Sequence, residues 1–133
     1  MTSIQSFVIE GGIDIGPLLS AQEQFSAALK IAKSDLEKAG TIQYFEFTYE
    51  LSWKMLRRLL KERGQELNSP KTVLRAAAQE GLIEQPELWF EFTEDRNNTV
   101  HSYNKAVAND IFKDLHLFDQ QVNILIQKLK SLK

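Results

Sequence analysis

The chain has 133 residues, of which 43% are hydrophobic, and a formal net charge of −2. This length and apolar content suit one domain with its own core, and the absence of cysteine excludes disulfides, thiolate chemistry and cysteine-ligated zinc. Apolar runs are short and interrupted by charge, and the N-terminus lacks a signal-peptide pattern, so we expect a cytoplasmic protein without a membrane span. The small net charge gives no overall cationic field, and any nucleic-acid partner must be attracted by a local patch.

The first residues differ in composition from the rest of the chain. Residues 1–17 carry three glycines and a proline among β-branched residues, which predicts a flexible or weakly extended leader. Helical periodicity starts at Leu18 and predicts a helical domain over residues 18–133. The first helix is expected over about 18–39, with Gly40 as its C-terminal cap.

The second predicted helix begins after Thr41, an expected N-cap, and continues to Gly64. It carries two apolar stripes on nearly opposite sides, which predict two neighbours. One stripe is Ile42, Phe45, Tyr49, Trp53, Leu56, Leu59 and Leu60, and the other is Tyr44, Phe47, Leu51 and Met55. A polar strip between them is interpreted as solvated or internally paired, and its carboxylates Glu46 and Glu50 are candidates for bordering a site.

The later helices have clear start signals. Ser69 and Pro70 predict a short helix that ends at Gly81, and Pro86 opens a fourth helix. Asn104 is the expected cap of one last helix with a heptad-like seam, which we interpret as packing within its own bundle. The seam consists of Ala108, Ile111, Leu115, Phe118, Val122, Leu125, Leu129 and Leu132. No strand is required, apart from a doubtful one in the leader, so the predicted class is all-α.

The segment RNNTVHSY, residues 96–103, lies at the end of the fourth predicted helix and holds one of only two histidines. Arg96 and His101 are separated by ~7.5 Å of rise and ~140° of rotation on an ideal helix. They meet only if the helix ends between them or a second copy contributes, whereas Asn97 is four residues from His101 and can touch it. The structural alternative pairs Arg96 with Glu94 or Asp95 and makes His101 a helix end.

Three segments, in order along the chain, resemble the HEPN superfamily, and more narrowly the nucleotidyltransferase substrate-binding proteins to which HepT-type toxins are related. They are IQYFEFTYELSWKMLRRLL, SPKTVLRAAAQEGLI and LWFEFTEDRNNTVHSY. The resemblance covers about residues 18–130 and implies an antiparallel four-helix up-and-down bundle with a short extra helix. It also implies a homodimer, encoded beside a minimal nucleotidyltransferase in a toxin–antitoxin-like module.

The same resemblance assigns roles within RNNTVHSY. The family's arginine, histidine and tyrosine fall on Arg96, His101 and Tyr103, and Asn97 occupies the position of a frequent asparagine. They imply a metal-independent ribonuclease formed across the dimer, with RNA as substrate and Tyr103 as the residue that the partner modifies with AMP. Arginine suits phosphate binding and histidine suits proton transfer, and a two-fold interface would supply two of each.

Other interpretations stay open at this point. In one of them, the chain is a noncatalytic subunit that presents an acceptor to the nucleotidyltransferase. In the other, RNNTVHSY is only a structural corner of the dimer. The acidic neighbours Glu91, Glu94 and Asp95 would weaken phosphate binding unless nearby cations offset them. His116 is interpreted as a surface residue. No cofactor is expected because no glycine-rich phosphate-binding signature is present, and the proposed reaction requires no metal.

Overall fold

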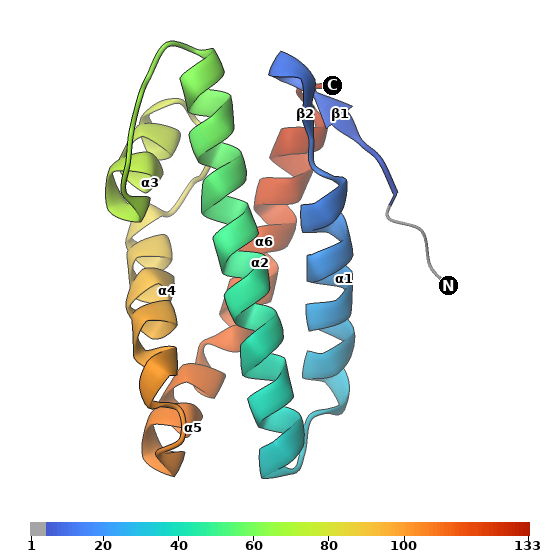
Figure 1. Ribbon diagram of the computed structural model, residues 1–133, viewed down its shortest axis with the longest axis vertical. Coiled ribbons are helices and arrows are strands. Elements are labelled where there is room, and N and C mark those ends of the chain that lie inside the picture. The colour runs from blue at the N-terminus through green and yellow to red at the C-terminus, as the bar shows by residue number, and fades with distance from the viewer. Residues whose placement is uncertain (1–4) are drawn as a thin grey trace.

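The computed structural model describes residues 5–133, which form an up-and-down bundle of long helices (Figure 1). The long helices are α1 (Gly16–Ile31), α2 (Asp35–Glu62), α4 (Pro86–Asn98) and α6 (Leu115–Lys130). Two short helices, α3 (Pro70–Gln79) and α5 (Lys105–Lys113), precede and follow α4. The predicted all-α four-helix bundle is therefore confirmed, with two short extra helices in place of one. Among the described residues, no helix is long and apolar enough to cross a membrane.

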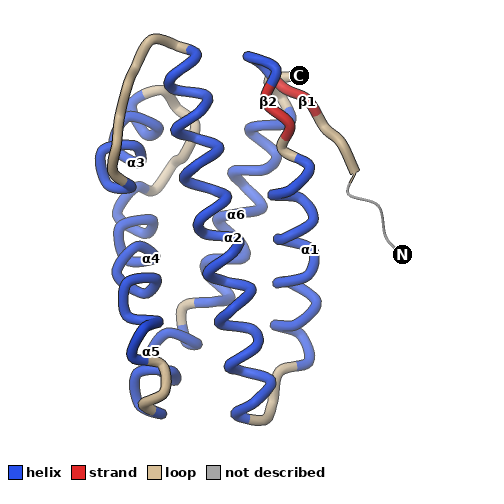
Figure 2. The backbone as a smooth tube through the Cα atoms, viewed as in Figure 1, coloured by secondary structure: helices blue, strands red, loops and turns tan. Residues whose placement is uncertain are grey.

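A small antiparallel hairpin packs against one end of the bundle, next to the end of α6 (Figure 2). β1 (Val8–Ile9) pairs with β2 (Ile13–Asp14) around a 3-10 turn at Glu10–Gly12. Its isoleucines are buried, and the Glu10 N–H donates to the Leu132 carbonyl at 2.9 Å. Of the two alternatives predicted for the leader over 1–17, the flexible one is wrong for this hairpin and the extended one holds, because its β-branched residues complete the core. Residues 1–4 of that leader lie outside the described residues.

The boundary between the first two helices differs from the prediction. α1 ends at Ile31, and α2 starts after Ser34, whose hydroxyl accepts from the Glu37 N–H while Glu37 Oε1 accepts from the Ser34 N–H. These two bonds form a capping box, a stronger start signal than glycine followed by threonine. The helix continues through Gly40 and Thr41, so neither residue caps a helix.

One broad buried arc, rather than two separate apolar faces, joins α2 to the bundle. Three small hydroxyl residues, Thr41, Thr48 and Ser52, lie between the predicted stripes and are buried. Each donates to the carbonyl oxygen four residues earlier, so no hydroxyl is left unsatisfied. The first stripe is buried throughout, whereas in the second Met55 is buried and Phe47 is 51% exposed. The two-face prediction is wrong because it counted serine and threonine as polar.

The predicted starts of the two middle helices are confirmed. Pro70 is the first residue of α3, and the Ser69 hydroxyl accepts from the N–H three residues on. Pro86 is the first residue of α4. Gly64 and Gly81 follow α2 and α3 with φ of 88° and 74°, in the left-handed region that glycine enters without strain.

The last predicted helix is broken at Asp114. Asn104 caps α5 as expected, since its side-chain oxygen accepts from two backbone N–H groups. α5 packs against α2 and α4, whereas α6 packs against α1, and one straight helix cannot do both. The apolar seam is still buried from Ile111 to Leu129. The predicted periodicity is therefore correct, but the prediction of one continuous helix is wrong.

An aromatic cluster centred on Phe118 of α6 fixes α4 in the bundle. The Phe118 ring packs edge-on against Phe45 of α2 and Trp89 and Phe92 of α4, with centroid separations of 4.8, 5.9 and 5.1 Å. Such pairs add to the apolar burial that holds a core together. This packing therefore holds α4, and with it the segment that follows its end, rigidly in the bundle.

Candidate functional site

The segment RNNTVHSY forms the corner between α4 and α5. α4 ends at Asn98, and a 3-10 turn follows at Thr99–His101. The Thr99 hydroxyl donates to the Arg96 carbonyl at 2.7 Å and accepts from Arg96 Nη1 at 3.2 Å. The helix thus ends between Arg96 and His101, which is one of the two conditions that the spacing set for their meeting.

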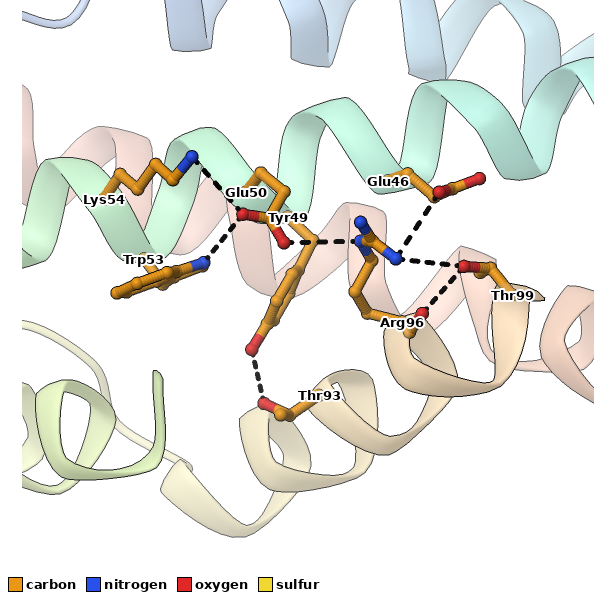
Figure 3. Close-up of polar contacts among 8 residues, drawn as sticks. All are labelled: Glu46, Tyr49, Glu50, Trp53, Lys54, Thr93, Arg96 and Thr99. Carbon is orange, nitrogen blue, oxygen red and sulfur yellow. Dashed lines mark hydrogen bonds and ion pairs between the residues drawn. The ribbon is translucent and has the colours of Figure 1, made fainter. Parts of the chain in front are cut away.

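The Arg96 side chain points from α4 to the polar strip of α2 (Figure 3). Arg96 Nη1 lies 3.5 Å from Glu46 Oε2, and Arg96 Nε lies 3.3 Å from Glu50 Oε1. The Nε–H group makes no hydrogen bond among the described residues, so its contact with Glu50 is an ion pair only. Each of the three side chains is about one-third exposed, at 29%, 31% and 33%. The guanidinium is therefore held in place at the surface and partly neutralised.

Neighbouring polar contacts keep α2 and α4 in register around this ion pair. The buried Tyr49 hydroxyl bonds to the Thr93 hydroxyl at 2.5 Å, and the Trp53 indole N–H donates to Glu50 at 3.2 Å (Figure 3). Burial raises the pKa of Tyr49 to about 12, so this phenol stays neutral. Glu50 also pairs with Lys54 at 3.6 Å. Glu50 is thus fixed by contacts other than its pair with Arg96.

His101 faces a different environment, which we name the acidic cavity. This cavity of about 220 Å³ is lined by Asp95, Asn98, His101, Val107, Asp110 and Ile111. One carboxylate oxygen of Asp95, Oδ2, is buried and has no hydrogen-bond partner in the described part of the chain. Burial, together with the nearby carboxylates of Asp114, Glu91 and Asp110, raises the pKa of Asp95 to about 8. Asp95 is therefore protonated over much of the neutral range.

Tyr103 is the exposed tyrosine of the corner. Its side chain is 86% exposed, and its ring lies edge-on to the His101 imidazole with 6.3 Å between centroids. Of the other two tyrosines, Tyr49 is buried and Tyr44 is partly buried against the core. Tyr103 is thus the tyrosine that an external protein can reach.

The structure brings only some of the predicted residues together. Glu46 and Glu50 contact Arg96, but no hydrogen bond or ion pair among residues 5–133 joins Arg96 to His101. Asn97 is exposed, and no hydrogen bond within that range links its amide to His101. Within one chain, the arginine faces α2 and the histidine faces the acidic cavity.

The alternative in which Arg96 pairs with Glu94 or Asp95 is wrong. Glu94 pairs with Lys71 of α3 at 2.9 Å, and Asp95 lines the acidic cavity, so neither carboxylate pairs with Arg96. His116 is exposed on α6, as expected.

Sequence reasoning missed the carboxyl groups that α5 brings to His101. Asp110 lines the cavity of His101, and Asp114 lies close to Asp95, because the chain breaks at Asp114 and folds α5 against α4. The heptad-like seam continues through this break, so the periodicity of the sequence does not indicate it. The sequence shows Asp95 as an unfavourable charge and gives no sign that it is a partly buried residue lining the same cavity as His101.

Comparison with known proteins agrees with this fold. A family model described as "Nucleotidyltransferase substrate binding protein like" matches residues 14–131. The Haemophilus influenzae protein "Probable ribonuclease HepT" is 33% identical over 100 residues, which are 70% of this chain and 67% of that protein.

Two solved structures match the bundle. A crystal structure of a Thermus thermophilus protein has a TM-score of 0.80 and 32% identity, and the match covers 84% of this chain and 98% of that one. A Haemophilus influenzae structure, described as revealing the fold of a substrate binding domain of a nucleotidyltransferase, has a TM-score of 0.76 and 28% identity, with 85% and 96% covered. The chain belongs to the nucleotidyltransferase substrate-binding protein-like family, as its motifs predicted.

Proposed function

We propose that this chain is the partner subunit of a minimal nucleotidyltransferase in a cytoplasmic toxin–antitoxin-like module, and that its homodimer is a metal-independent endoribonuclease. The observation that carries this proposal is the α4–α5 corner, where an exposed His101 follows an anchored Arg96 in a chain similar to "Probable ribonuclease HepT". Family membership supports the nucleotidyltransferase partner.

Arg96 is suited to hold the phosphate of the cleaved bond. Glu46, Glu50 and Thr99 fix its guanidinium before RNA arrives, which lowers the ordering cost of binding. The exposed part of the fork then binds phosphate oxygens. Glu46 and Glu50 act as positioning residues in this account.

His101 is the proposed proton-transfer group. Cleavage needs a base that takes the proton of the ribose 2′-OH, attack of that oxygen on phosphorus, and an acid that protonates the leaving 5′-oxygen. The products are a 2′,3′-cyclic phosphate end and a free 5′-OH end. Asp95 lines the same cavity, and its raised pKa leaves that cavity less negative at neutral pH than its carboxyl groups suggest.

A second copy of the chain would bring an arginine and a histidine together, which a single chain does not do. Because Arg96 and His101 of one chain face different neighbours, we place Arg96 of one protomer opposite His101 of the other. Asn97, exposed between them in the sequence, is assigned to orienting the RNA or the partner's imidazole.

Mixing two inactive variants tests this composite site. Arg96→Ala and His101→Ala are each expected to lose cleavage, but refolding them together gives heterodimers in which one site keeps both residues. With equal amounts of the two variants, half of the dimers would be heterodimers, and each heterodimer would have one intact site of its two. About a quarter of wild-type activity should therefore return. No recovery, with heterodimers confirmed by native mass spectrometry, would contradict a site shared between protomers.

Tyr103 is the proposed acceptor of the partner's nucleotidyl group. Its exposure supports access by another protein, and a charged adduct beside His101 would block RNA. Incubation with the nucleotidyltransferase and ATP should add adenylyl mass to the wild type and to Tyr44→Phe but not to Tyr103→Phe. Equal labelling of all three proteins would move the acceptor elsewhere.

A specific observation favours a second candidate, the noncatalytic substrate-binding subunit. Asp110 lines the cavity beside His101 and Asp114 lies close to Asp95, and these carboxylates oppose a phosphate there. In that case His101→Ala would leave binding to the nucleotidyltransferase intact, and neither wild type nor variant would cleave RNA.

A further inference from the structure

A second cavity lies next to the α4–α5 corner, and we name it the Tyr103 cavity. It has a volume of about 150 Å³ and lies between the start of α2 and the start of α5. It is lined by Asp35, Lys38, Ala39, Ile42, Ser102, Tyr103, Lys105, Ala108 and Asn109. Along α5, these lining residues and those of the acidic cavity fall on opposite helical faces. The short helix thus separates two cavities of different chemistry.

The lining of the Tyr103 cavity combines an apolar wall with cations and an amide. Ile42, Ala39 and Ala108 supply the apolar surface. Lys38 has no carboxylate within 4.0 Å among the described residues, and Lys105 pairs only with the exposed Asp35 at 3.3 Å. The Asn109 side chain makes no hydrogen bond within that part of the chain and is exposed. The Lys38 ammonium lies 5.4 Å from the centroid of the Phe112 ring, so a ligand phosphate would add to a weak contact there, whereas at Lys105 it would compete with Asp35. The Asn109 amide is available to a ligand.

This combination of an apolar wall, two cations and an amide suits the binding of a single nucleotide unit. An aromatic base needs a flat apolar surface, its edge needs hydrogen-bonding groups, and its phosphate needs cations. The volume of about 150 Å³ is below the ~300 Å³ at which sites for drug-sized ligands begin, so the cavity suits a single base. The Tyr103 ring, 86% exposed, is free to stack on that base.

The position of the cavity relates it to the proposed reaction. Tyr103 is shared between the two features, since it lines the cavity while its ring lies 6.3 Å from the His101 ring. A nucleotide whose base enters the cavity would therefore be adjacent to the phosphate that reaches His101.

We propose that the Tyr103 cavity binds the base of the RNA nucleotide next to the cleaved bond and gives the nuclease its base preference. This inference rests on the proposed ribonuclease function. Asn109 is the residue assigned to reading the base edge, and Lys38 and Lys105 bind the flanking phosphate.

Nucleotide binding can be measured without cleavage. The probes are the four nucleoside 3′-monophosphates, titrated into the ¹⁵N-labelled full chain. Wild type should show saturable shifts of the Lys38 and Asn109 amides with at least one nucleotide. Ala39→Phe fills the cavity from an exposed position on α2 and should weaken this binding at least tenfold. Ala106→Phe, exposed on α5 outside the cavity, is the matched control and should bind as wild type.

Two results would overturn the inference: no saturable shift with any of the four nucleotides, or equal affinity in wild type and Ala39→Phe with both folded. A cleavage assay on RNAs that differ in the base beside the cut separates this inference from the ribonuclease proposal. If Ala39→Phe still cleaves with the wild-type base preference, the cavity has no such role although the nuclease stands. If wild type binds nucleotides and cleaves nothing, the ribonuclease proposal fails while the nucleotide site is supported.

Discussion

Asp95→Asn should stabilise the protein at alkaline pH and leave its stability unchanged in acid. Burial and the neighbouring carboxylates raise the folded-state pKa of Asp95 from 3.8 to about 8. The folded state therefore keeps a proton that the unfolded state releases, and stability falls as pH rises between these two values. Asparagine has the same shape and never ionises, so it avoids that loss.

The size of the effect follows from the pKa difference. Converted in full, that difference would correspond to ~6 kcal/mol of unfolding free energy. Asp95 is only partly buried, so solvent screening reduces this to ~1–2 kcal/mol, or ~3–6 °C in Tm for a chain of this size. Thermal melts followed by circular dichroism at pH 4, 7 and 9 measure it. The matched control is Glu94→Gln, which changes the preceding residue, an exposed carboxylate paired with Lys71. A Tm difference that does not grow with pH, or that appears equally in Glu94→Gln, would refute the reasoning.

Three further substitutions test the packing that supports the corner. Phe118→Ala removes the centre of the aromatic cluster and should cost ~3–5 kcal/mol of unfolding free energy in urea titrations, whereas a loss below about 1 kcal/mol would mean that the cluster does not carry the core. Tyr49→Phe removes the buried bond to Thr93 and should cost ~1 kcal/mol by the same method, because Thr93 still donates to the Trp89 carbonyl. Ser34→Ala removes the capping box of α2 and should cost ~1 kcal/mol; an unchanged urea midpoint would show that α2 does not depend on this cap.

Local signals in the sequence predicted much of the fold. Proline at the first helical position marked α3 and α4, and three- and four-residue steps identified the buried face of α6. The errors arose where two local signals competed or where tertiary packing decided. Gly40 followed by Thr41 looked like a helix boundary, but the Ser34 capping box starts α2 earlier and the glycine is tolerated inside at a cost of ~1 kcal/mol. The break at Asp114 depends on where α5 and α6 pack, which periodicity cannot show.

The sequence singled out the residues of the candidate corner but could not show which side chains contact them. The spacing of Arg96 and His101 allowed them to meet only at a helix end or through a second copy; α4 does end between them, yet within one chain they face different neighbours. The contact of Arg96 with Glu46 and Glu50 joins helices about fifty residues apart in the chain, and no local pattern encodes that pairing. The burial of Asp95 depends in the same way on α5 folding back against α4.

The decisive experiment is RNA cleavage in the presence of a metal chelator by wild type, His101→Ala and His116→Ala. The chain has only two histidines, so His116, exposed on α6, is a matched control. We expect cleavage by wild type and His116→Ala that leaves 2′,3′-cyclic phosphate ends, and none by His101→Ala. Equal cleavage by His101→Ala, or inactivity of a folded, dimeric wild type, would contradict the assignment of the α4–α5 corner as a ribonuclease site.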